Sequence, residues 1–354
     1  MTTRAGTTPA GTTPAGNAQH LVVEVTRGAI VESRHLVSAA LADAGGELVA
    51  TWGEVEGPVF ARSAVKPIQA LPLLESGAAE ALAVSDAELA LACASHGGEP
   101  LHVAAVRDWL ARLGLAQADL ECGAHPPLHE PSAEALVRSA AAPSALHNNC
   151  SGKHAAMLAT ARHLGEETRG YIRSAHPVQR RVAACLADMS GCDLERAPEA
   201  SDGCGIPTFA LPLSGLARAM ARLAEPAREG PTRAAACRRV TAAMAAHPLM
   251  VAGHGRCCTA VIEASGGAVL AKGGAEGVYT AALPGAGLGL ALKADDGAKR
   301  ASEAALLALL TGLEALDASQ RERIAALAGS PVLNRRGEEV GVVRVAERSA
   351  RGLD

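Results

Sequence analysis

The distribution of strand-like and helix-like segments places the strongest limit on how this chain can fold. Alternating apolar segments typical of β-strands lie near both ends, and Ala/Leu-rich segments with helical spacing fill the middle. The predicted strands cover 20–28, 30–41, 46–53, 257–265, 268–274, 277–284, 288–296 and 338–347. The predicted helices cover 64–76, 86–94, 100–114, 132–141, 151–164, 174–190, 211–224, 231–246, 298–315 and 317–328.

This order predicts an α/β (α+β) fold in which both chain ends complete one mixed sheet, from about 19–58 and 255–349. The helical part, about 59–254, is then a subdomain inserted between the two halves of the sheet. Because no linker divides the chain, we expect a single domain over 19–349. Residues 1–18 contain "AGTTP" twice and almost nothing apolar to bury, which predicts a disordered tail.

Composition argues against several kinds of partner. The net charge of −4 leaves no basic excess to neutralise phosphates, so we expect neither nucleic acid nor an anionic membrane as a partner. No apolar run approaches the roughly 20 residues that span a bilayer. The nine cysteines follow no export signal, which is typical of free thiols in a reducing cytoplasm.

Lysine is rare in this chain. Only five of the 33 basic residues are lysines, at Lys66, Lys153, Lys272, Lys293 and Lys299. Arginine stays protonated in proteins, whereas a buried lysine can become a neutral base. Lys66 follows Ser63 by about one helical turn, so its amine can accept the proton of the Ser63 hydroxyl. The same pattern also fits a simple helix start, with Ser63 as the N-cap and Pro67 in the first turn.

Two further segments fit the same kind of site. Lys272 precedes two glycines in "VLAKGGAEGV", a loose match to the strand lysine of β-lactamase-type acyl-transferring enzymes, and it also fits an ordinary Gly-rich hairpin. Ser95 ends the run "LACASHGG", which fits either a second active hydroxyl or a helix C-terminus. Lys293 and Lys299 flank "ADDGAKR" and are predicted to be surface residues, with Lys293 as the competing downstream lysine.

A possible metal site involves two separated cysteines. Cys150 and Lys153 lie one turn apart at a predicted helix N-terminus in "HNNCSGKHAAML", where the helix dipole favours a thiolate. Cys204 lies in the Gly/Pro loop "SDGCGIP". Two thiolates can hold a soft or borderline metal, but lysine is an uncommon ligand, so spacing alone favours ordinary thiols. Asp202, in the same loop, fits either a loop cap or a partner for a substrate ammonium.

Together these segments resemble the rhizobial-type L-asparaginases, the asparaginase II family. The resemblance runs from about His20 to Val345. It rests on "RGAIVESRH", "FARSAVKPIQALPLLESG", "ACASHGGEPLHV", "HNNCSGKHAAMLA", "SDGCGIPTFALPL" and "ALKADDG", which occur in this order. That family is similar in fold to the serine β-lactamases and serine glutaminases, in agreement with the split sheet predicted above.

The resemblance implies hydrolysis of the side-chain amide of L-asparagine to L-aspartate and ammonia through an acyl-enzyme. The implied catalytic groups are two Ser–Lys pairs, Ser63 with Lys66 and Ser95 with Lys272. The implied zinc site is Cys150, Lys153 and Cys204. Arg62 and Asp202 are candidates for holding the substrate's α-carboxylate and α-ammonium, and the backbone N–H groups of Ser63 and Ala275 for the oxyanion hole. We expect a homodimer.

Two alternatives remain at this point. One is another serine amidohydrolase, glutaminase or β-lactamase-like, on the same apparatus; the chain lacks Ser-Asp-Asn and Lys-Thr-Gly motifs, which counts against the β-lactamase reading. The other is a non-catalytic zinc- or amino-acid-binding protein on the same fold. The complete set of serines and lysines counts against that second alternative.

Overall fold

Both chain ends contribute to one large sheet. The computed structural model describes residues 19–346, so the tail predicted over 1–18 lies outside the described residues. The eight-stranded sheet has the order β10-β11-β1-β2-β9-β8-β7, and β3 pairs with β2. Its strands are β1 (Leu21–Arg27), β2 (Ile30–Asp43), β3 (Leu48–Trp52), β7 (Leu270–Gly273), β8 (Val278–Leu283), β9 (Leu288–Ala294), β10 (Ser330–Leu333) and β11 (Glu339–Val345).

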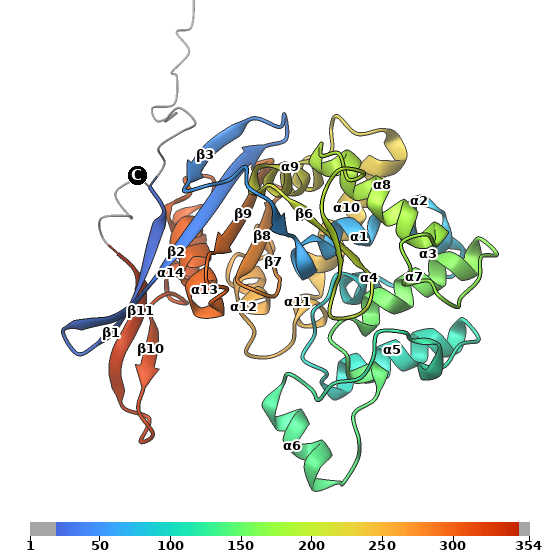
Figure 1. Cartoon of the computed structure of the whole chain (residues 1–354), viewed down its shortest axis with the longest axis horizontal. Coiled ribbons are helices and arrows are strands. Elements are labelled where there is room, and N and C mark those ends of the chain that lie inside the picture. Colours follow the sequence, from blue (N-terminus) through green and yellow to red (C-terminus); the bar gives the residue numbers. More distant parts are fainter. Residues whose placement is uncertain (1–18, 347–354) are drawn as a thin grey trace, which may run out of the picture.

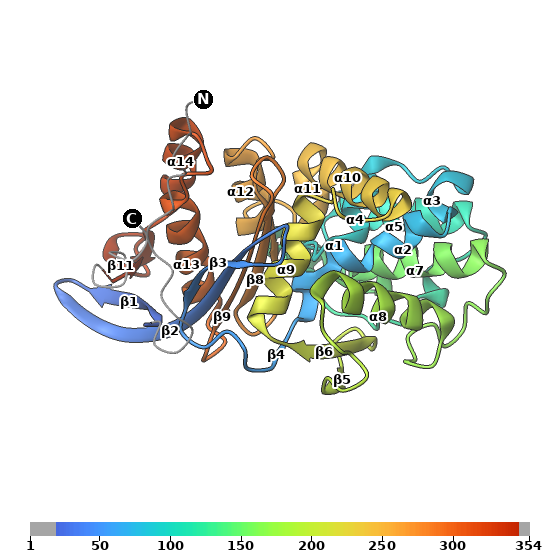
Figure 2. The same cartoon turned by 90° about the horizontal axis from the view of Figure 1, so that it is seen from above.

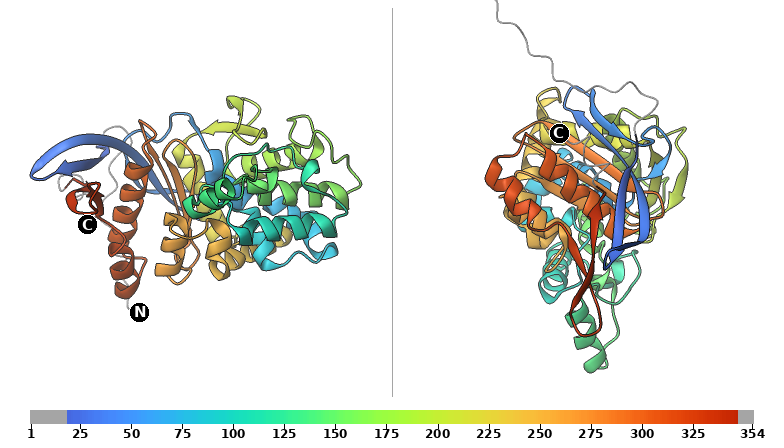
Figure 3. Two further views of the ribbon diagram at one scale, coloured as in Figure 1. Left: turned by 90° about the horizontal axis from the view of Figure 1, so that it is seen from below. Right: turned by 90° about the vertical axis from the view of Figure 1, so that its left-hand side faces the viewer.

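Strand β2 joins the two ends of the chain. It pairs with β1 along its first half and with β9 along its second half, from Val37↔Ala294 to Asp43↔Leu288. The blue N-terminal strands accordingly lie beside the orange and red C-terminal strands (Figures 1 and 3). The predicted sheet from both ends is confirmed. Every pairing among the described residues is antiparallel, however, so the sheet is not mixed.

The two faces of the sheet differ in side-chain size. Ala40 and Ala42 of β2 belong to the core shared with α9 (Leu213–Ala224), whereas Leu41 between them belongs to the core shared with α13 (Lys299–Gly312). A Cβ on Gly289 of β9 would lie 2.1 Å from the backbone nitrogen of Ala221 in α9. Small residues therefore allow α9 to cross the sheet in direct contact, while α12 (Cys257–Ala264), α13 and α14 (Ala318–Ala325) cover the other face (Figure 2).

The helical part packs beyond α9, on the side away from α13 (Figure 2). Its helices are α1 (Lys66–Gln69), α2 (Leu71–Glu75), α3 (Ala78–Ala81), α4 (Asp86–Ala92), α5 (Pro100–Arg112), α6 (Glu130–Arg138), α7 (Ser151–His163), α8 (Pro177–Ser190), α10 (Pro231–Ala246) and α11 (Pro248–Val251). Short 3₁₀ turns are η1 (Arg62–Val65), η2 (Gln117–Asp119) and η3 (Ala145–His147), and a small sheet joins β4 (Val59–Phe60), β6 (Pro207–Leu211) and β5 (Glu199–Ser201). Within residues 19–346, every helix is too short or too polar to span a bilayer.

Two predicted elements differ from the structure. The segment 257–265, predicted as a strand, forms helix α12 (Cys257–Ala264). Its buried residues Cys258, Val261 and Ile262 have helical spacing, and a short apolar run of this kind fits either period. The helix predicted over 64–76 is divided into η1, α1 and α2, because Pro67 and Pro72 restrict the backbone of the residue before each of them. Strands β4, β5, β6 and β10 were not predicted.

Candidate active site

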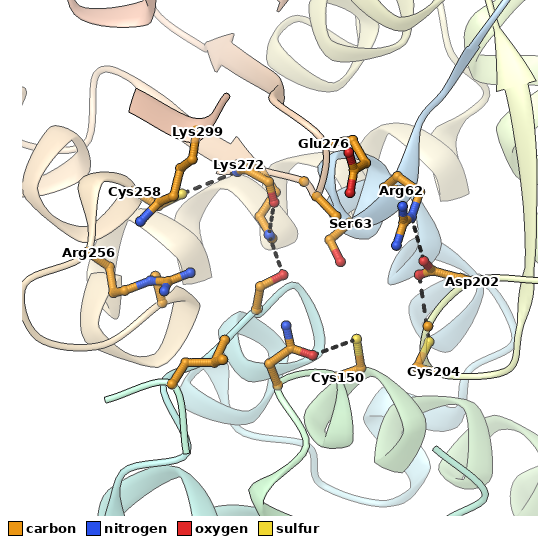
Figure 4. Close-up of a pocket in the computed structure, with 18 of the residues that line it drawn as sticks. Arg62, Ser63, Cys150, Asp202, Cys204, Arg256, Cys258, Lys272, Glu276 and Lys299 are labelled. Carbon is orange, nitrogen blue, oxygen red and sulfur yellow. Dashed lines mark hydrogen bonds and ion pairs between the residues drawn. The ribbon is translucent and has the colours of Figure 1, made fainter. Parts of the chain in front are cut away.

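A pocket of about 640 Å³ lies where the sheet meets the helical part (Figure 4). Its walls come from η1, the β7–β8 hairpin, the segment after α4, the start of α7 and the loop between β5 and β6. The predicted site residues on these walls are Arg62, Ser63, Ser95, Cys150, Asp202, Cys204, Lys272 and Ala275. The fold thus brings together residues that are up to 213 positions apart in the chain (275 − 62).

Ser63 lies inside η1, which packs directly on the β7–β8 hairpin. The Thr280 hydroxyl on β8 donates a hydrogen bond to the Ala64 carbonyl, 2.8 Å away. A Cβ on Gly274 would lie 3.2 Å from the Ala64 nitrogen, so a larger residue there would push η1 away. Arg62 has a φ of 49°, a left-handed conformation that costs energy in a non-glycine residue and occurs often at functional sites. The sheet therefore fixes the position of Ser63.

Two buried lysines share the hydroxyl of Ser95. The Ser95 Oγ lies 3.0 Å from Lys66 Nζ and 2.8 Å from Lys272 Nζ. Lys66 also donates to the Ala94 carbonyl, and Lys272 donates to the carbonyl of Gly273, 2.7 Å away. Both lysine side chains are fully enclosed, at 0% and 1% exposure. Ser95 is thus a hydrogen-bonded bridge between two amines.

Burial, and after it the nearby charge of Lys66, lower the pKa of Lys272 to about 7. The hydrogen-bond partners of the Lys272 amine are the Ser95 hydroxyl and the Gly273 carbonyl, and neither is a carboxylate. A lysine with this pKa is half deprotonated near neutral pH, so it can accept a proton. The scarcity of lysine in the sequence suggested this property, because a buried lysine can become a neutral base and an arginine cannot.

Ser63 and Lys66 are not hydrogen-bonded to each other among the described residues, although the sequence predicts that pair. The reason is that the amine of Lys66 turns towards the Ala94 carbonyl, Ser95 and Cys150 instead. The predicted second pair, Ser95 with Lys272, is in contact. Lys293 binds the carbonyl of Asp295 and does not line the pocket.

Two of the predicted metal ligands, Cys150 and Cys204, line the pocket, and the third, the buried Lys153, contacts Cys204. Lys153 Nζ lies 3.0 Å from Cys204 Sγ, and Lys66 Nζ lies 3.1 Å from Cys150 Sγ. A hydrogen bond from Cys204 and the charges of Lys66 and Lys153 hold the pKa of Cys150 well below its usual value, against the effect of burial. The same hydrogen bond, together with burial, raises the pKa of Cys204. The cluster therefore holds one thiolate and one thiol.

The donor set fits a thiophilic metal only if Lys153 gives up its proton. Burial alone would lower the pKa of Lys153, but the neighbouring Cys150 and Cys204 sulfurs raise it above its usual value. Within residues 19–346, no three His, Cys, Asp or Glu side chains converge as a metal site, so an amine ligand is required. Two thiols and one amine at contact distance are compatible with zinc, because zinc accepts both sulfur and nitrogen ligands.

Arg62 and Asp202 form an ion pair at the edge of the pocket (Figure 4). Arg62 Nε lies 2.7 Å from Asp202 Oδ1. Burial would raise the pKa of Asp202, but the charge of Lys153 and the hydrogen bond from Arg62 lower it. Nearby, the backbone N–H of Ala275 donates to no described residue, whereas that of Gly274 is bound to the Val278 carbonyl. The pocket thus offers a cation, an anion and an available amide donor.

Several residues of the pocket were not predicted from the sequence. Asn148 accepts a hydrogen bond from the Cys150 N–H at 2.8 Å and donates to the Cys122 carbonyl at 2.8 Å, so it shapes the turn before α7. Lys299 lines the pocket although its side chain is 61% exposed, as predicted for a surface residue. The sequence also gave no signal for several further lining residues, among them His125, Arg256, Cys258, Glu276 and Tyr279.

A family model described as L-asparaginase II matches residues 23–345, a range that contains every residue of the pocket. A match over nearly the whole chain shows that this protein is a hydrolase acting on amides. The chain belongs to the L-asparaginase II family. No curated protein matches its sequence.

Two solved structures are similar to the fold at low identity. One is a protein provisionally assigned as a beta-lactamase from Bacteroides dorei, with a TM-score of 0.40, 14% identity, and coverage of 73% of this chain and 84% of that one. The other is a simvastatin synthase mutant from Aspergillus terreus, with a TM-score of 0.38, 13% identity, and coverage of 72% and 86%. Both scores lie below 0.5, so neither description is carried over to this chain.

The shared hydroxyl predicts a difference in stability between two serine variants. Ser95→Ala removes a hydrogen bond from two buried amines, so we expect it to lower the free energy of unfolding by about 1–3 kcal/mol. The matched control is Ser63→Ala, whose hydroxyl contacts no described polar group and whose loss should cost less than about 0.5 kcal/mol. Urea unfolding at one pH measures both. Equal losses would contradict the bridging role of Ser95.

Proposed function

We propose that this protein is an L-asparaginase that works through an acyl-enzyme on Ser63. The observation that carries the proposal is the hydrogen-bonded set Lys66–Ser95–Lys272, of which Ser95 and Lys272 line the same pocket as Ser63. The L-asparaginase II family supports amide hydrolysis, and the arrangement of serines and lysines supports a nucleophilic serine with an amine base. The substrate and the covalent mechanism are the parts that experiment must test.

In the proposed mechanism, the Ser63 hydroxyl forms an ester bond with the carbonyl carbon of the asparagine side chain. Lys66 accepts the proton of that hydroxyl. Lys272 is half deprotonated near pH 7, and through Ser95, which both amines contact, it can accept a proton from Lys66. The C–N bond then breaks, and the leaving nitrogen receives a proton and departs as ammonia. Water cleaves the ester, which yields aspartate and restores Ser63.

The charged groups at the edge of the pocket match the two charges of an amino acid. In the proposal, the free guanidinium nitrogens of Arg62 hold the substrate's α-carboxylate. Asp202, whose lowered pKa keeps it ionised, holds the α-ammonium. The N–H groups of Ser63 and Ala275 stabilise the negative charge that develops on the amide oxygen.

We also propose a supporting zinc ion held by Cys150, Lys153 and Cys204. When bound, zinc would supply a fixed positive charge and would keep both thiols and the Lys153 amine deprotonated. Cys150 hydrogen-bonds to Lys66, and Asp202 lies two residues before Cys204, so the ligands connect directly to both the lysine set and the substrate-binding pair. The Ser–Lys groups already account for nucleophile and base.

For the molecule as a whole, we propose a cytoplasmic homodimer with one domain over 19–349. All nine cysteines are free thiols, which is the state expected in a reducing compartment. The single continuous family match over 23–345 supports one domain.

Ser63→Ala is expected to lower kcat for asparagine by about 10³-fold or more while the fold is retained, because loss of a covalent nucleophile removes the reaction path. Lys66→Arg should be as damaging as Lys66→Ala, because arginine cannot act as a neutral base. Ammonia release from L-asparagine measures both effects. The matched control, Lys293→Arg, changes a lysine outside the pocket and should keep activity within about threefold. Residual activity of Ser63→Ala within about tenfold of wild type would exclude Ser63, and rescue by Lys66→Arg would exclude the base.

Metal analysis is expected to find about one zinc per chain, lost in the Cys150→Ala/Cys204→Ala double variant. Because Ser63 and the lysines perform the chemistry, chelation should raise KM for asparagine more than it lowers kcat. Measuring both constants before and after chelation tests this. Complete loss of kcat at saturating asparagine, restored by zinc, would instead show a metal-dependent hydrolase and overturn the serine mechanism.

A further inference from the structure

Arg256 lines the pocket but has no part in the mechanism proposed above. It directly precedes α12, and Figure 4 shows its guanidinium directed towards the centre of the pocket. That guanidinium forms no hydrogen bond or ion pair with any other residue in the range 19–346. The partly buried Arg222 and Arg233, by contrast, each bind a carboxylate. Arg256 therefore presents an unneutralised cation to whatever fills the pocket.

The loop that carries Arg256 is fastened to the segment that carries Ser95. Glu99, which is 3% exposed, accepts hydrogen bonds from the His254 backbone N–H at 2.9 Å and from His254 Nδ1 at 2.6 Å. Gly253 has a φ of +106°, and a Cβ there would lie 2.1 Å from a Glu99 carboxylate oxygen. The two hydrogen bonds and the close approach at Gly253 hold residues 253 and 254 against the segment that carries Ser95. The backbone of Arg256, two residues further on, therefore starts from a fixed point beside the pocket.

The charges lie on two opposite sides of the catalytic serines. Figure 4 shows Arg62 and Asp202 on one side, Arg256 and Lys299 on the other, and Ser63 with Lys272 between them. Lys299 is partly neutralised by Glu303, whose carboxylate oxygen lies 3.5 Å from its amine. Arg256 is therefore the stronger anion-binding group on its side.

The orientation of the substrate in the proposed reaction assigns a role to the side of the pocket that holds Arg256. If Arg62 and Asp202 hold the aspartyl end of the substrate, the leaving nitrogen points away from them and towards Arg256. The leaving group of asparagine is ammonia, which has no charge or length to reach an arginine. A pocket of about 640 Å³ also falls in the size range that encloses ligands much larger than one amino acid. The side of the pocket that faces the leaving group therefore has more volume and more positive charge than ammonia can use.

We propose that Arg256 forms a subsite for a carboxylate on the leaving group, so that the enzyme also hydrolyses β-aspartyl amino acids. In these amides, the nitrogen on the aspartyl side chain belongs to a second amino acid, whose carboxylate pairs with Arg256. This inference rests on the proposed function and extends its substrate class. Ser63 forms an ester with the same carbonyl carbon, and the C–N bond breaks. The proton from Ser63 passes to the amine, which leaves as a free amino acid, and water cleaves the ester to aspartate.

The test compares three substrates that differ only on the amide nitrogen: L-asparagine, N4-methyl-L-asparagine and β-aspartyl-glycine. Release of ammonia, methylamine and glycine gives kcat/KM for each. The wild-type enzyme is expected to favour β-aspartyl-glycine over N4-methyl-L-asparagine by about tenfold or more, because a charge-assisted hydrogen bond forms only with the former. Arg256→Gln should abolish that preference. Arg107→Gln, which changes a 61% exposed arginine on α5 outside the pocket, should keep it.

The outcomes distinguish a failure of the Arg256 subsite from a failure of the proposed function. Hydrolysis of asparagine without hydrolysis of β-aspartyl-glycine would overturn the subsite and leave the proposed function intact. If Arg256→Gln lowered kcat/KM equally for all three substrates, Arg256 would bind the aspartyl end, and the leaving-group assignment would be wrong. If none of the three amides were hydrolysed, the proposed function would fail, and the subsite with it.

Discussion

Two buried lysine amines contact the hydroxyl of Ser95. The other charged groups of the pocket are arranged around the positive charge of these amines. Two ammonium groups this close at a buried position repel strongly, so the protein gains by leaving one amine without a proton. Lys272 is the group whose surroundings favour that outcome, because it faces a hydroxyl and a carbonyl. The sulfur of Cys150, with its lowered pKa, faces Lys66 instead.

From Cys150 the charges continue in alternating order across the wall of the pocket. The Cys150 thiolate is followed by the Lys153 ammonium, the Asp202 carboxylate and the Arg62 guanidinium. Each charge lies next to an opposite one, which offsets part of the cost of removing it from water. This arrangement links the lysines proposed to move protons with the pair proposed to hold the substrate. It also explains why the proposed metal, whose ligands occupy the middle of the series, is expected to affect substrate binding.

The sequence was sufficient for the parts of the fold that depend on local patterns. The helix predicted over 231–246 appears as α10 (Pro231–Ala246), and the strands at both ends form one sheet. The segment 257–265 could not be assigned correctly, because its short apolar run fits both a strand and the helix α12. The sequence also identified Ser63, Ser95, Lys66 and Lys272 as a group. It could not show that Lys66 turns to Ser95 and not to Ser63, because that contact joins residues 29 positions apart and depends on how η1 packs on the sheet.

The proposed proton transfer depends on the lowered pKa of the Lys272 amine, and NMR titration of lysine side chains measures this pKa directly. The chain has only five lysines, so protein labelled with ¹³C at lysine should give five resolvable signals, with the Lys272 signal assigned by its loss in Lys272→Met. We expect the Lys272 signal to titrate at a pKa of about 7, with the amine neutral above that pH and charged below it. A Lys272 signal that titrates near the ordinary lysine pKa of about 10.4 would show that the amine stays charged at neutral pH and cannot act as a proton acceptor.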